Sequence, residues 1–598
     1  MSRTVNVGRR KVLGVAGAGV LGASALVMGS AAPASAATAE TWLDSLTGSG
    51  DEASVFQAAI DALGPNGGVI RVPAGTYYIG TTLALGSNVC LVGAGITATV
   101  LRDHANLGNN KMMTAIGSSG TRLRNIAIRD LTIRNGTAGV GTPTIGRDAL
   151  RVEYVDGITL ERVRVTEIQG LYGVSYVGST GIVIRDCEFY RCAHTMVAVL
   201  IENDGVTVSG STFDTVTNTV TTNTYTFMTG AELNNTGSFF VRNLLIENNV
   251  FLNNPRWEGV DCHGGENIVI RNNVIKNCKV GVALQHAHGY LADQSQEVLR
   301  NVLVADNIIE QGNGDNGQAG ISVVGNVQRL SENIRIIGNN ITGFTGQDAC
   351  PGSITLYCVQ HVWIEQNQVW DHGVYGVCFW HSVFGATIRS NYFFGANSTA
   401  AANATSAAIG VTNGGTFGVL VEDNTVDATA VNKTVNYFLR AFNQYESWQI
   451  RNNRILNVKQ TNPYYNSSLL PVERTAIPTA SLVQRYGDLV YNTSGSAGWV
   501  ATAPKRGYGS LDTTTVVVKA TIASGSDQMA IVAGGASDFR AVPPGMNITV
   551  AGAGPSGGLL SARVLEWNAP GTVTLDVSAS TSVTAANVKY QGLTLAAV

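Results

Sequence analysis

The six residues Ile246-Glu247-Asn248-Asn249-Val250-Phe251 return 24 positions later as Ile270-Arg271-Asn272-Asn273-Val274-Ile275. Both copies read apolar, two polar residues, asparagine, any residue, apolar. The same asparagine returns, 24 to 34 residues apart, at Asn307, Asn339, Asn367, Asn391, Asn424 and Asn453. Self-similarity at this period predicts a solenoid, and the strand-like alternation inside each copy excludes helical repeats.

The asparagine has two physical explanations. Earlier copies keep the apolar frame without it, at 128–133, 160–165, 184–189 and 208–213. If each copy is one strand and its turn, the asparagines stack about 4.8 Å apart, and each amide bonds the neighbours above and below. Alternatively, asparagine only forms a turn that needs a left-handed backbone. Both explanations predict the same fold.

A second strand precedes each asparagine copy and begins with glycine and an apolar residue. Examples start at Gly173, Gly259, Gly281, Gly320 and Gly376. Insertions of variable length separate the strands. In a solenoid such insertions project as loops, and they commonly shape a groove.

The segment before the repeats looks like the closed end of a solenoid. Residues Ser54 to Asp61 are amphipathic with helical period, which predicts a helix covering the core of the first coil. Gly67 to Tyr77 (GGVIRVPAGTY) and Leu91 to Gly95 (LVGAG) follow. This order resembles the start of the pectate-lyase-like superfamily, which includes rhamnogalacturonases, tailspike depolymerases and related enzymes.

The resemblance covers about residues 42–458. It implies an all-β chain with a right-handed parallel β-helix and an N-terminal capping helix, acting on a polysaccharide. It does not select the reaction, because the superfamily contains lyases, hydrolases and epimerases.

Composition and segment patterns predict the domain organisation of the 598 residues. Only 14% of residues are charged and 69 are glycine, which disfavours helical bundles. Residues 1–36 carry Arg9-Arg10, an apolar run and Ala34-Ser35-Ala36, as in a twin-arginine signal peptide. We expect the β-helix over 37–458, a linker or packed tail over 459–485, and a small β domain over 486–598.

This organisation predicts a secreted, extracellular protein with no membrane contact after the signal is removed. Removing residues 1–36 takes four positive charges from a net charge of −3, leaving −7. Such a charge disfavours nucleic acid as a partner and fits weakly with a strongly polyanionic substrate, although a local basic groove could override the net value. The polysaccharide substrate is what the family resemblance implies. No cofactor and no metal site is expected, since no CxxC pattern and no calcium-lyase cluster of acidic and basic residues appears.

The leading hypothesis for the site is a glycoside hydrolase. Aligning Gly230 with Gly259 places Glu232 beside Asp261, about 5 Å away, near the carboxylate spacing of retaining glycosidases. Mutual repulsion would raise one pKa and give an acid and a nucleophile. His263 would orient a carboxylate. The substrate-binding candidates are Asn234, Trp257, Glu258, Gln285, His286 and His288, with Asn234, His263 and Gln285 in one row.

Two other hypotheses stay open. Asp261-Cys262-His263 resembles the Asp-x-His of β-helix alginate epimerases, although Cys262 replaces the usual proline. That resemblance implies a C5-epimerase or a lyase acting on a uronate polymer, with His263 as base and Arg256 or Lys279 serving the uronate carboxylate. The third hypothesis is a noncatalytic glycan-binding solenoid.

Overall fold

The computed structural model describes most of the chain from residue 39 onwards. The described range is 39–456 apart from 45, 49, 137–141, 219–222, 231–239, 287–297, 313–316, 326–329, 345–351, 397–405, 413–415, 428–434, 442–444 and 447. Beyond 456 it describes separate segments, the longest being 516–533, 547–569 and 572–590. Among all these residues, no helix has both the length and the apolar character that crossing a bilayer requires. The predicted signal peptide lies outside the described residues.

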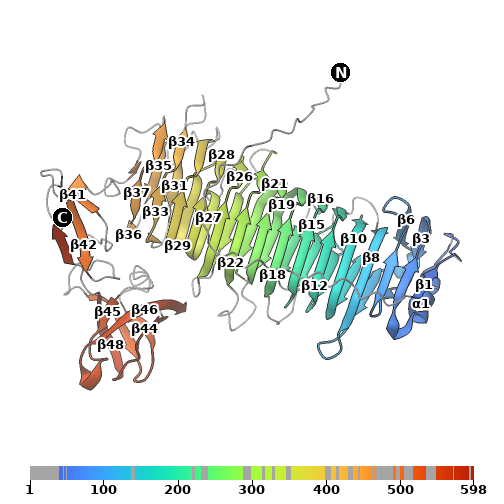
Figure 1. Cartoon of the computed structure of the whole chain (residues 1–598), viewed down its shortest axis with the longest axis horizontal. Coiled ribbons are helices and arrows are strands. Elements are labelled where there is room, and N and C mark those ends of the chain that lie inside the picture. Colours follow the sequence, from blue (N-terminus) through green and yellow to red (C-terminus); the bar gives the residue numbers. More distant parts are fainter. Residues whose placement is uncertain are drawn as a thin grey trace. The chain divides into compact units, whose positions relative to one another are not determined.

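Parallel strands connected coil to coil fill the first and longer part of the described chain (Figure 1). Each complete coil passes through three sheets, and each strand pairs in parallel with its counterparts one coil before and one coil after. Ile182, for example, pairs with Ile158 and with Val206. The predicted parallel β-helix is therefore confirmed.

We number the sheets by their order within a coil, and six long strands turn a corner and belong to two sheets. These six are β8 (Leu123–Arg134), β10 (Val155–Thr166), β19 (Val250–His263), β21 (Val274–Gln285), β27 (Gly352–Glu365) and β29 (Tyr375–Arg389). Sheet 1 contains the strands at Gly173, Gly259, Gly281, Gly320 and Gly376 and their counterparts in the other coils. These strands are β4 (Leu83–Ala84), β7 (Met113–Ile116), β9 (Leu150–Glu153), β11 (Tyr172–Val177), β14 (Thr195–Leu200), β17 (Tyr225–Gly230), the ends of β19 and β21, β24 (Ala319–Val324), the starts of β27 and β29, β31 (Ala407–Val411), β35 (Tyr437–Ala441) and β39 (Tyr464–Tyr465).

Sheet 2 leads up to the repeated asparagine. Its strands are β1 (Ala39–Trp42), β2 (Gly68–Arg71), β5 (Val89–Val92), the starts of β8 and β10, β12 (Thr180–Arg185), β15 (Asp204–Ser209), β18 (Val241–Glu247), β20 (Gly265–Arg271), β22 (Leu299–Ala305), β25 (Ser331–Ile337), the ends of β27 and β29, β32 (Thr416–Phe417), β33 (Leu420–Glu422), β36 (Tyr445–Glu446) and β37 (Gln449–Arg451).

Sheet 3 follows the asparagine. Its strands are β3 (Gly75–Ile79), β6 (Thr99–Asp103), the ends of β8 and β10, β13 (Glu188–Cys192), β16 (Thr212–Val216), the starts of β19 and β21, β23 (Ile308–Glu310), β26 (Asn340–Thr342), β28 (Gln368–His372), β30 (Tyr392–Ala396), β34 (Thr425–Asp427) and β38 (Arg454–Leu456).

The asparagines form the corner between sheets 2 and 3, and they stack as predicted. The side-chain amide of Asn273 donates to Oδ1 of Asn307, in the next coil, at 3.0 Å. It also donates to the backbone carbonyl of Ile246, in the preceding coil, at 3.0 Å. The backbone N–H of Asn273 donates to the same Oδ1 at 3.0 Å. This pattern repeats to Asn453, so the polar corner is fully bonded although it is buried. The left-handed backbone falls on the preceding residue, Asn272 in this copy with φ of 55°, and not on the repeated asparagine, so the turn explanation does not account for that asparagine.

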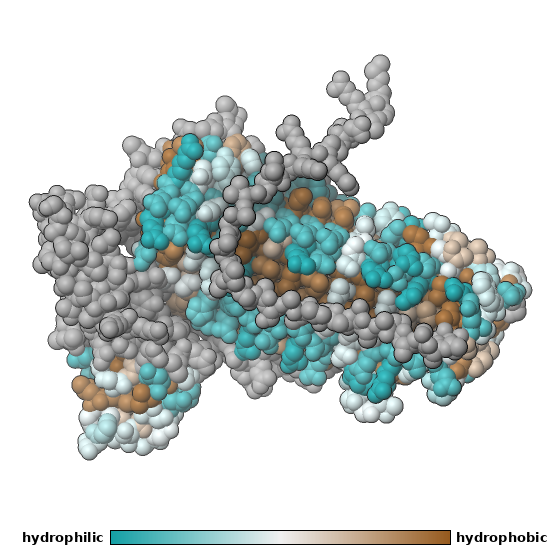
Figure 2. All heavy atoms as spheres, viewed as in Figure 1, coloured by the Kyte–Doolittle hydropathy of each residue, from teal (hydrophilic) through white to brown (hydrophobic). Residues whose placement is uncertain are grey.

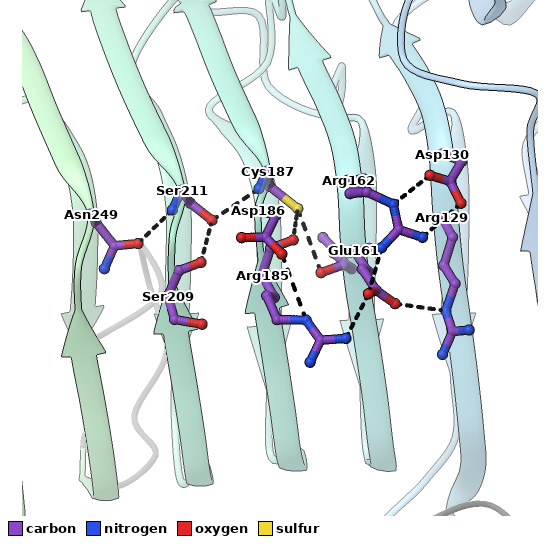
Figure 3. A network of polar contacts seen from close by, with 11 residues as sticks. Arg129, Asp130, Glu161, Arg162, Arg185, Asp186, Cys187, Ser209, Ser211 and Asn249 are labelled. Atoms are coloured by element: carbon purple, nitrogen blue, oxygen red, sulfur yellow. Dashed lines mark hydrogen bonds and ion pairs between the residues drawn. The ribbon is translucent and has the colours of Figure 1, made fainter.

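Smaller groups fill the same corner in the earlier coils (Figure 3). The backbone N–H of Ser211 donates to Asn249 Oδ1 at 2.9 Å, and that of Cys187 donates to Ser211 Oγ at 3.1 Å. On sheet 2 nearby, Glu161 binds Arg162 and Arg185, both at 2.6 Å, and Arg129 at 3.2 Å. Burial raises the pKa of Glu161, but the guanidinium groups of Arg185 and Arg162 lower it by a larger amount, so the net shift is downward.

One continuous apolar core fills the coils. Phe189, Phe213 and Phe251 stack in it, with ring centroids 4.8 and 4.6 Å apart. Outside, Figure 2 shows a band of hydrophobic residues along the visible face of the coils, between hydrophilic patches. Cys187 and Cys192 are buried thiols and do not form the disulfide that their spacing allows.

The predicted capping helix is confirmed as α1 (Ala53–Ala62), beside β1 in Figure 1. Its apolar face buries Phe56 completely, and the Phe56 ring meets Tyr77 of β3 edge-on at 6.2 Å. The first coil has no coil before it, so α1 keeps its core out of water. Three short 3₁₀ turns are also described, at Gly64–Asn66, Ala105–Leu107 and Pro555–Gly557.

The C-terminal region is a small antiparallel β unit, as expected. Six strands close into a barrel: β43 (Val516–Ile522), β44 (Gln528–Ala533), β47 (Thr572–Leu575), β46 (Leu560–Ala569), β45 (Asn547–Val550) and β48 (Val583–Tyr590). Its core contains Ile522, Met529, Ile548, Val573 and Val588. A separate sheet joins β40 (Glu473–Arg474), β41 (Leu489–Asn492), β42 (Gly498–Ala503) and β49 (Thr594–Ala597).

Replacing a corner asparagine should destabilise the β-helix more than replacing an exposed one. Asn307→Ala removes bonds to Ile270, Asn273 and Asn339 in the interior, and we expect a loss of about 2–4 kcal/mol of unfolding free energy. Asn301→Ala breaks only exposed amide bonds and strains a left-handed position, at a cost of about 1 kcal/mol. Denaturant titration followed by circular dichroism measures both. Equal losses would contradict a stabilising role for the buried corner.

Candidate functional site

The end of β19 carries three ionisable side chains on the outer face of sheet 1. Alternation along the strand buries Val260 and Cys262 in the core and turns Asp261 and His263 outward. Glu258 precedes them across Gly259, where a Cβ would lie 2.7 Å from the carbonyl oxygen of Gly281. Only glycine therefore allows the strand to bend so closely against the next coil, and the bend directs Glu258 to the same face as Asp261.

This outer face is shielded from water although it is not part of the core. Asp261 is 0% exposed and Glu258 2% exposed, while the side chain of His263 keeps 12%. Their neighbours in the preceding coil are Tyr225, beside Glu258, and Met228, beside Asp261. The carboxylates thus sit in a partly apolar environment, in which ionisation is costly.

His263 is held between two acceptors. Its Nε2 lies 2.9 Å from Asp261 Oδ2, and its Nδ1 lies 3.4 Å from the carbonyl oxygen of His286. Its backbone N–H donates to the hydroxyl of Thr229 at 3.1 Å. Burial lowers the pKa of His263, but the Asp261 carboxylate raises it more, so the net shift is upward.

Gln285, one coil on, connects the two carboxyl groups. It pairs with His263 in the register of sheet 1, as predicted. Its amide nitrogen donates to Glu258 Oε1 at 2.7 Å and lies 3.5 Å from Asp261 Oδ1. One side chain therefore fixes the positions of both carboxyl groups.

Glu258 differs from Asp261 in its protonation. Burial and the nearby charge of Asp261 raise the pKa of Glu258 well above its ordinary value, against the opposing effects of Gln285, Trp257 and Lys279. The raised pKa favours the neutral, protonated form of the Glu258 carboxyl, and in that form it can donate a hydrogen bond. Tyr225 also stays protonated, because burial and the charges of Asp261 and Glu258 raise its pKa.

A cation lies at the edge of this group. The ammonium of Lys279 stands 4.7 Å from the centroid of the Trp257 ring. The site thus combines a charged couple (Asp261 and His263), a protonated carboxyl, a phenol and an ammonium. Within the part of the chain that is described, no group of three or more His, Cys, Asp or Glu side chains is arranged to hold a metal ion.

The structure brings together Asp261, His263, Glu258, Gln285 and Trp257 of the predicted residues. His286 contributes its carbonyl, while its ring lies 3.3 Å from the carbonyl oxygen of Val324 in the next coil. Glu232, Asn234 and His288 lie outside the described residues.

The predicted alignment of Gly230 with Gly259 is wrong. Phe227 pairs with Val260 and Met228 with Asp261, so Met228 occupies the position expected for Glu232. Gly230 is the last residue of β17 and lies next to His263 of the following coil. A Cβ atom at position 230 would lie 3.2 Å from the Cβ of His263. The second carboxyl group beside Asp261 is Glu258, from the same strand.

Tyr225 and Thr229 were missed by the sequence reasoning. Matching the core residues Phe227 and Val260, instead of the glycines, would have placed Tyr225 opposite Glu258. The useful signal was the apolar alternation within the strand.

Residues 114–296, which include the whole site, match the family described as "Right handed beta helix region". The chain contains a right-handed β-helix. A relative with a curated description, the mannuronan C5-epimerase AlgE3 of Azotobacter vinelandii, is 28% identical over 151 residues, which is 23% of this chain. The chain spans only 8% of the length of that epimerase.

Solved structures that are similar to this chain include the adhesin PfbA of Streptococcus pneumoniae. Its sequence is 16% identical, the TM-score is 0.46, and the match covers 70% of this chain and all of the adhesin chain. The A-module of the Azotobacter vinelandii mannuronan C-5 epimerase AlgE4 is 18% identical with a TM-score of 0.38, covering 71% of this chain and 99% of the module.

The buried proton on Glu258 should make stability depend on pH. The folded-state pKa of Glu258 is raised, so its favourable contribution is complete below the unfolded pKa of about 4.3 and is lost as pH rises towards the folded value. Glu258→Gln cannot ionise. We therefore expect its melting temperature, relative to the unaltered protein, to rise between pH 5 and pH 8.

Differential scanning fluorimetry across that range measures the effect. Glu266→Gln, the same change on the outer face of β20, serves as the control and should show a difference that is independent of pH. A constant difference for Glu258→Gln would mean that Glu258 is ionised in the folded protein.

Proposed function

We propose that the protein inverts C5 of uronate residues within a polysaccharide. The observation that carries this proposal is the Asp261–His263 couple beside the buried Glu258, whose pKa is raised. The short stretch of similarity to a mannuronan C5-epimerase agrees with it. The substrate is extracellular in this proposal, since residues 1–36 have the pattern of a twin-arginine signal.

His263 removes the proton from C5. Asp261 accepts from Nε2–H, so in the neutral ring Nδ1 carries the lone pair. This nitrogen makes no hydrogen bond to the His286 carbonyl oxygen, 3.4 Å away, until it has accepted the proton from C5. When the C5–H bond breaks, its electron pair moves into the adjacent carboxylate group. The imidazolium that forms is stabilised by Asp261, and its new N–H points to the carbonyl of His286.

The substrate carboxylate must be neutralised for this step, because its own charge opposes a carbanion at C5. Glu258 donates a hydrogen bond from its protonated carboxyl, and Lys279 adds positive charge at the edge of the site. We propose that the phenol of Tyr225, which pairs with Glu258 in the strand register, returns a proton to C5. Return from the opposite side of the ring gives the epimer. Loss of the C4 oxygen substituent instead would give a lyase product.

A second candidate is a glycoside hydrolase that uses Glu258 and Asp261. The observation in its favour is that one protonated and one ionised carboxyl group share the amide of Gln285. Such a pair supplies an acid and a nucleophile. This pair replaces the Glu232–Asp261 pair of the sequence hypothesis.

Two substitutions separate these candidates. Asp261→Asn removes the anion that stabilises the imidazolium, and we expect epimerisation to slow at least ~100-fold. Glu258→Gln keeps a neutral hydrogen-bond donor, so epimerisation should stay within about tenfold of the original rate. A hydrolase would lose its acid in Glu258→Gln and its activity with it.

Mannuronan and polygalacturonate are suitable substrates. Proton NMR of the polymer reports C5 inversion, ultraviolet absorbance reports unsaturated ends, and a reducing-sugar assay reports hydrolysis. Glu266→Gln is the control, and thermal unfolding verifies that each variant folds. New reducing ends without inversion would overturn the epimerase proposal in favour of the hydrolase.

The rate should also rise with pH. Only neutral His263 accepts a proton, so kcat/KM should increase as pH passes through the raised pKa of this residue. Asp261→Asn removes the charge that raises the pKa of His263, while burial continues to lower that pKa. The rising limb of the residual activity should therefore move to lower pH. An identical limb in both proteins would exclude His263 as the base.

A further inference from the structure

A second hollow lies on another face of the β-helix. Its volume is about 830 Å³, and it lies over the outer face of sheet 3 at β6, β8, β10, β13 and β16. Ile96 and Thr97, from the segment before β6, form part of its lining. It shares no residue with the candidate site on sheet 1. Its volume falls within the range of pockets that hold small ligands, roughly 300–1,000 Å³.

Two rows of side chains from successive coils form the floor. In the first row Arg164 lies between Thr132 and Glu188, and Thr212 follows Glu188. In the second row Arg134, Thr166, Tyr190 and Asp214 follow one another, one from each coil. The floor is therefore a regular lattice of hydroxyl, guanidinium and carboxylate groups around one aromatic ring.

Tyr190 is the aromatic ring and it is 43% exposed. The guanidinium of Arg191 lies 6.0 Å from its centroid. A half-exposed ring among polar side chains offers an apolar surface to the C–H face of a sugar, and its neighbours offer hydrogen bonds to the sugar hydroxyls.

Several of those neighbours keep hydrogen-bonding capacity for a ligand. Arg164 binds only Oε2 of Glu188, through Nε at 2.7 Å and a terminal nitrogen at 2.6 Å. Oδ1 of Asp214 accepts from Thr215 at 2.9 Å and from Asn253 at 2.7 Å. Within the described chain, Oε1 of Glu188 and Oδ2 of Asp214 accept no hydrogen bond. These two oxygens can each receive a ligand hydroxyl.

The charges of the lining determine which sugars fit. Two arginines, Arg134 and Arg164, stand against three carboxylates, Glu167, Glu188 and Asp214, and Arg134 pairs with Glu167. The lining is thus slightly negative, which disfavours a uronate carboxylate and suits uncharged hydroxyl groups.

We propose that this hollow binds neutral sugar units of a polysaccharide without altering them. It offers an aromatic platform and paired donors and acceptors. The hollow is independent of the chemistry proposed for sheet 1. A chain held here and at sheet 1 would gain affinity through two attachments.

Affinity electrophoresis in gels containing xylan, a β-1,3-glucan, alginate or polygalacturonate tests the proposal with the full-length mature chain. We expect at least one neutral polymer to retard the protein. Tyr190→Ala should raise the dissociation constant for that polymer ~10-fold or more, as for loss of a central aromatic contact. Tyr190→Phe, which keeps the ring, should change it much less.

Trp42→Ala is the matched control, because Trp42 is also a half-exposed aromatic residue with an arginine, Arg71, 5.9 Å from its centroid. It should bind as the unaltered protein does. No retardation by either neutral polymer would overturn the proposal, and so would retardation that survives Tyr190→Ala. Because the readout is binding, either result leaves the epimerase proposal unaffected.

Discussion

Hydrogen bonds from one asparagine side chain to the next set the geometry on which the β-helix depends. They hold the corner between sheets 2 and 3 at the same place in every coil from Asn249 to Asn453, whether the coil contains 24 residues or 34. Extra residues must therefore leave the coil elsewhere, as loops. Side chains on the sheets then fall into straight rows, one residue from each coil. The candidate site and the sheet 3 hollow are both made from such rows.

Side chains that stand in such rows on the outer face of a sheet are ordinarily exposed to water. The candidate site differs because β19 leaves the regular strand geometry. Gly259 lets β19 bend, and Glu258 joins Asp261 on one buried face. Two carboxyl groups that share an amide and little water cannot both ionise at low cost. The raised pKa of Glu258 favours its protonated form, while Asp261 has His263 beside it, with Nε2 2.9 Å from Oδ2. Acid and base are therefore distinguished by position within one strand.

The fold could be predicted because its signals are local and repeated. The asparagine copies reveal the coils, and the alternation of Val260 and Cys262 directs Asp261 and His263 outward. The row of His263 and Gln285 follows from the 22-residue step between similar strands. The coil before them has a different length and no asparagine, so the glycine alignment misplaced Glu232, and Tyr225 went unnoticed. The hollow on sheet 3 needs five strands and a connecting segment together, and no single stretch of sequence carries its signal.

The asparagine corner also has a direction. Each Nδ2 donates to the Oδ1 of the next asparagine towards the C-terminal end and also to a backbone carbonyl one coil back, whereas each asparagine Oδ1 accepts from the coil on its N-terminal side. The side-chain carbonyls therefore share one direction along the corner. At the N-terminal end of this row the backbone N–H of Ser211 donates to Asn249 Oδ1, so the first asparagine oxygen is bonded although no asparagine precedes it. Asn453 keeps the same bonds as the others to the carbonyls of Val421, one coil back, and Arg451. The corner of the β-helix therefore has a polarity along its axis, set by side chains alone.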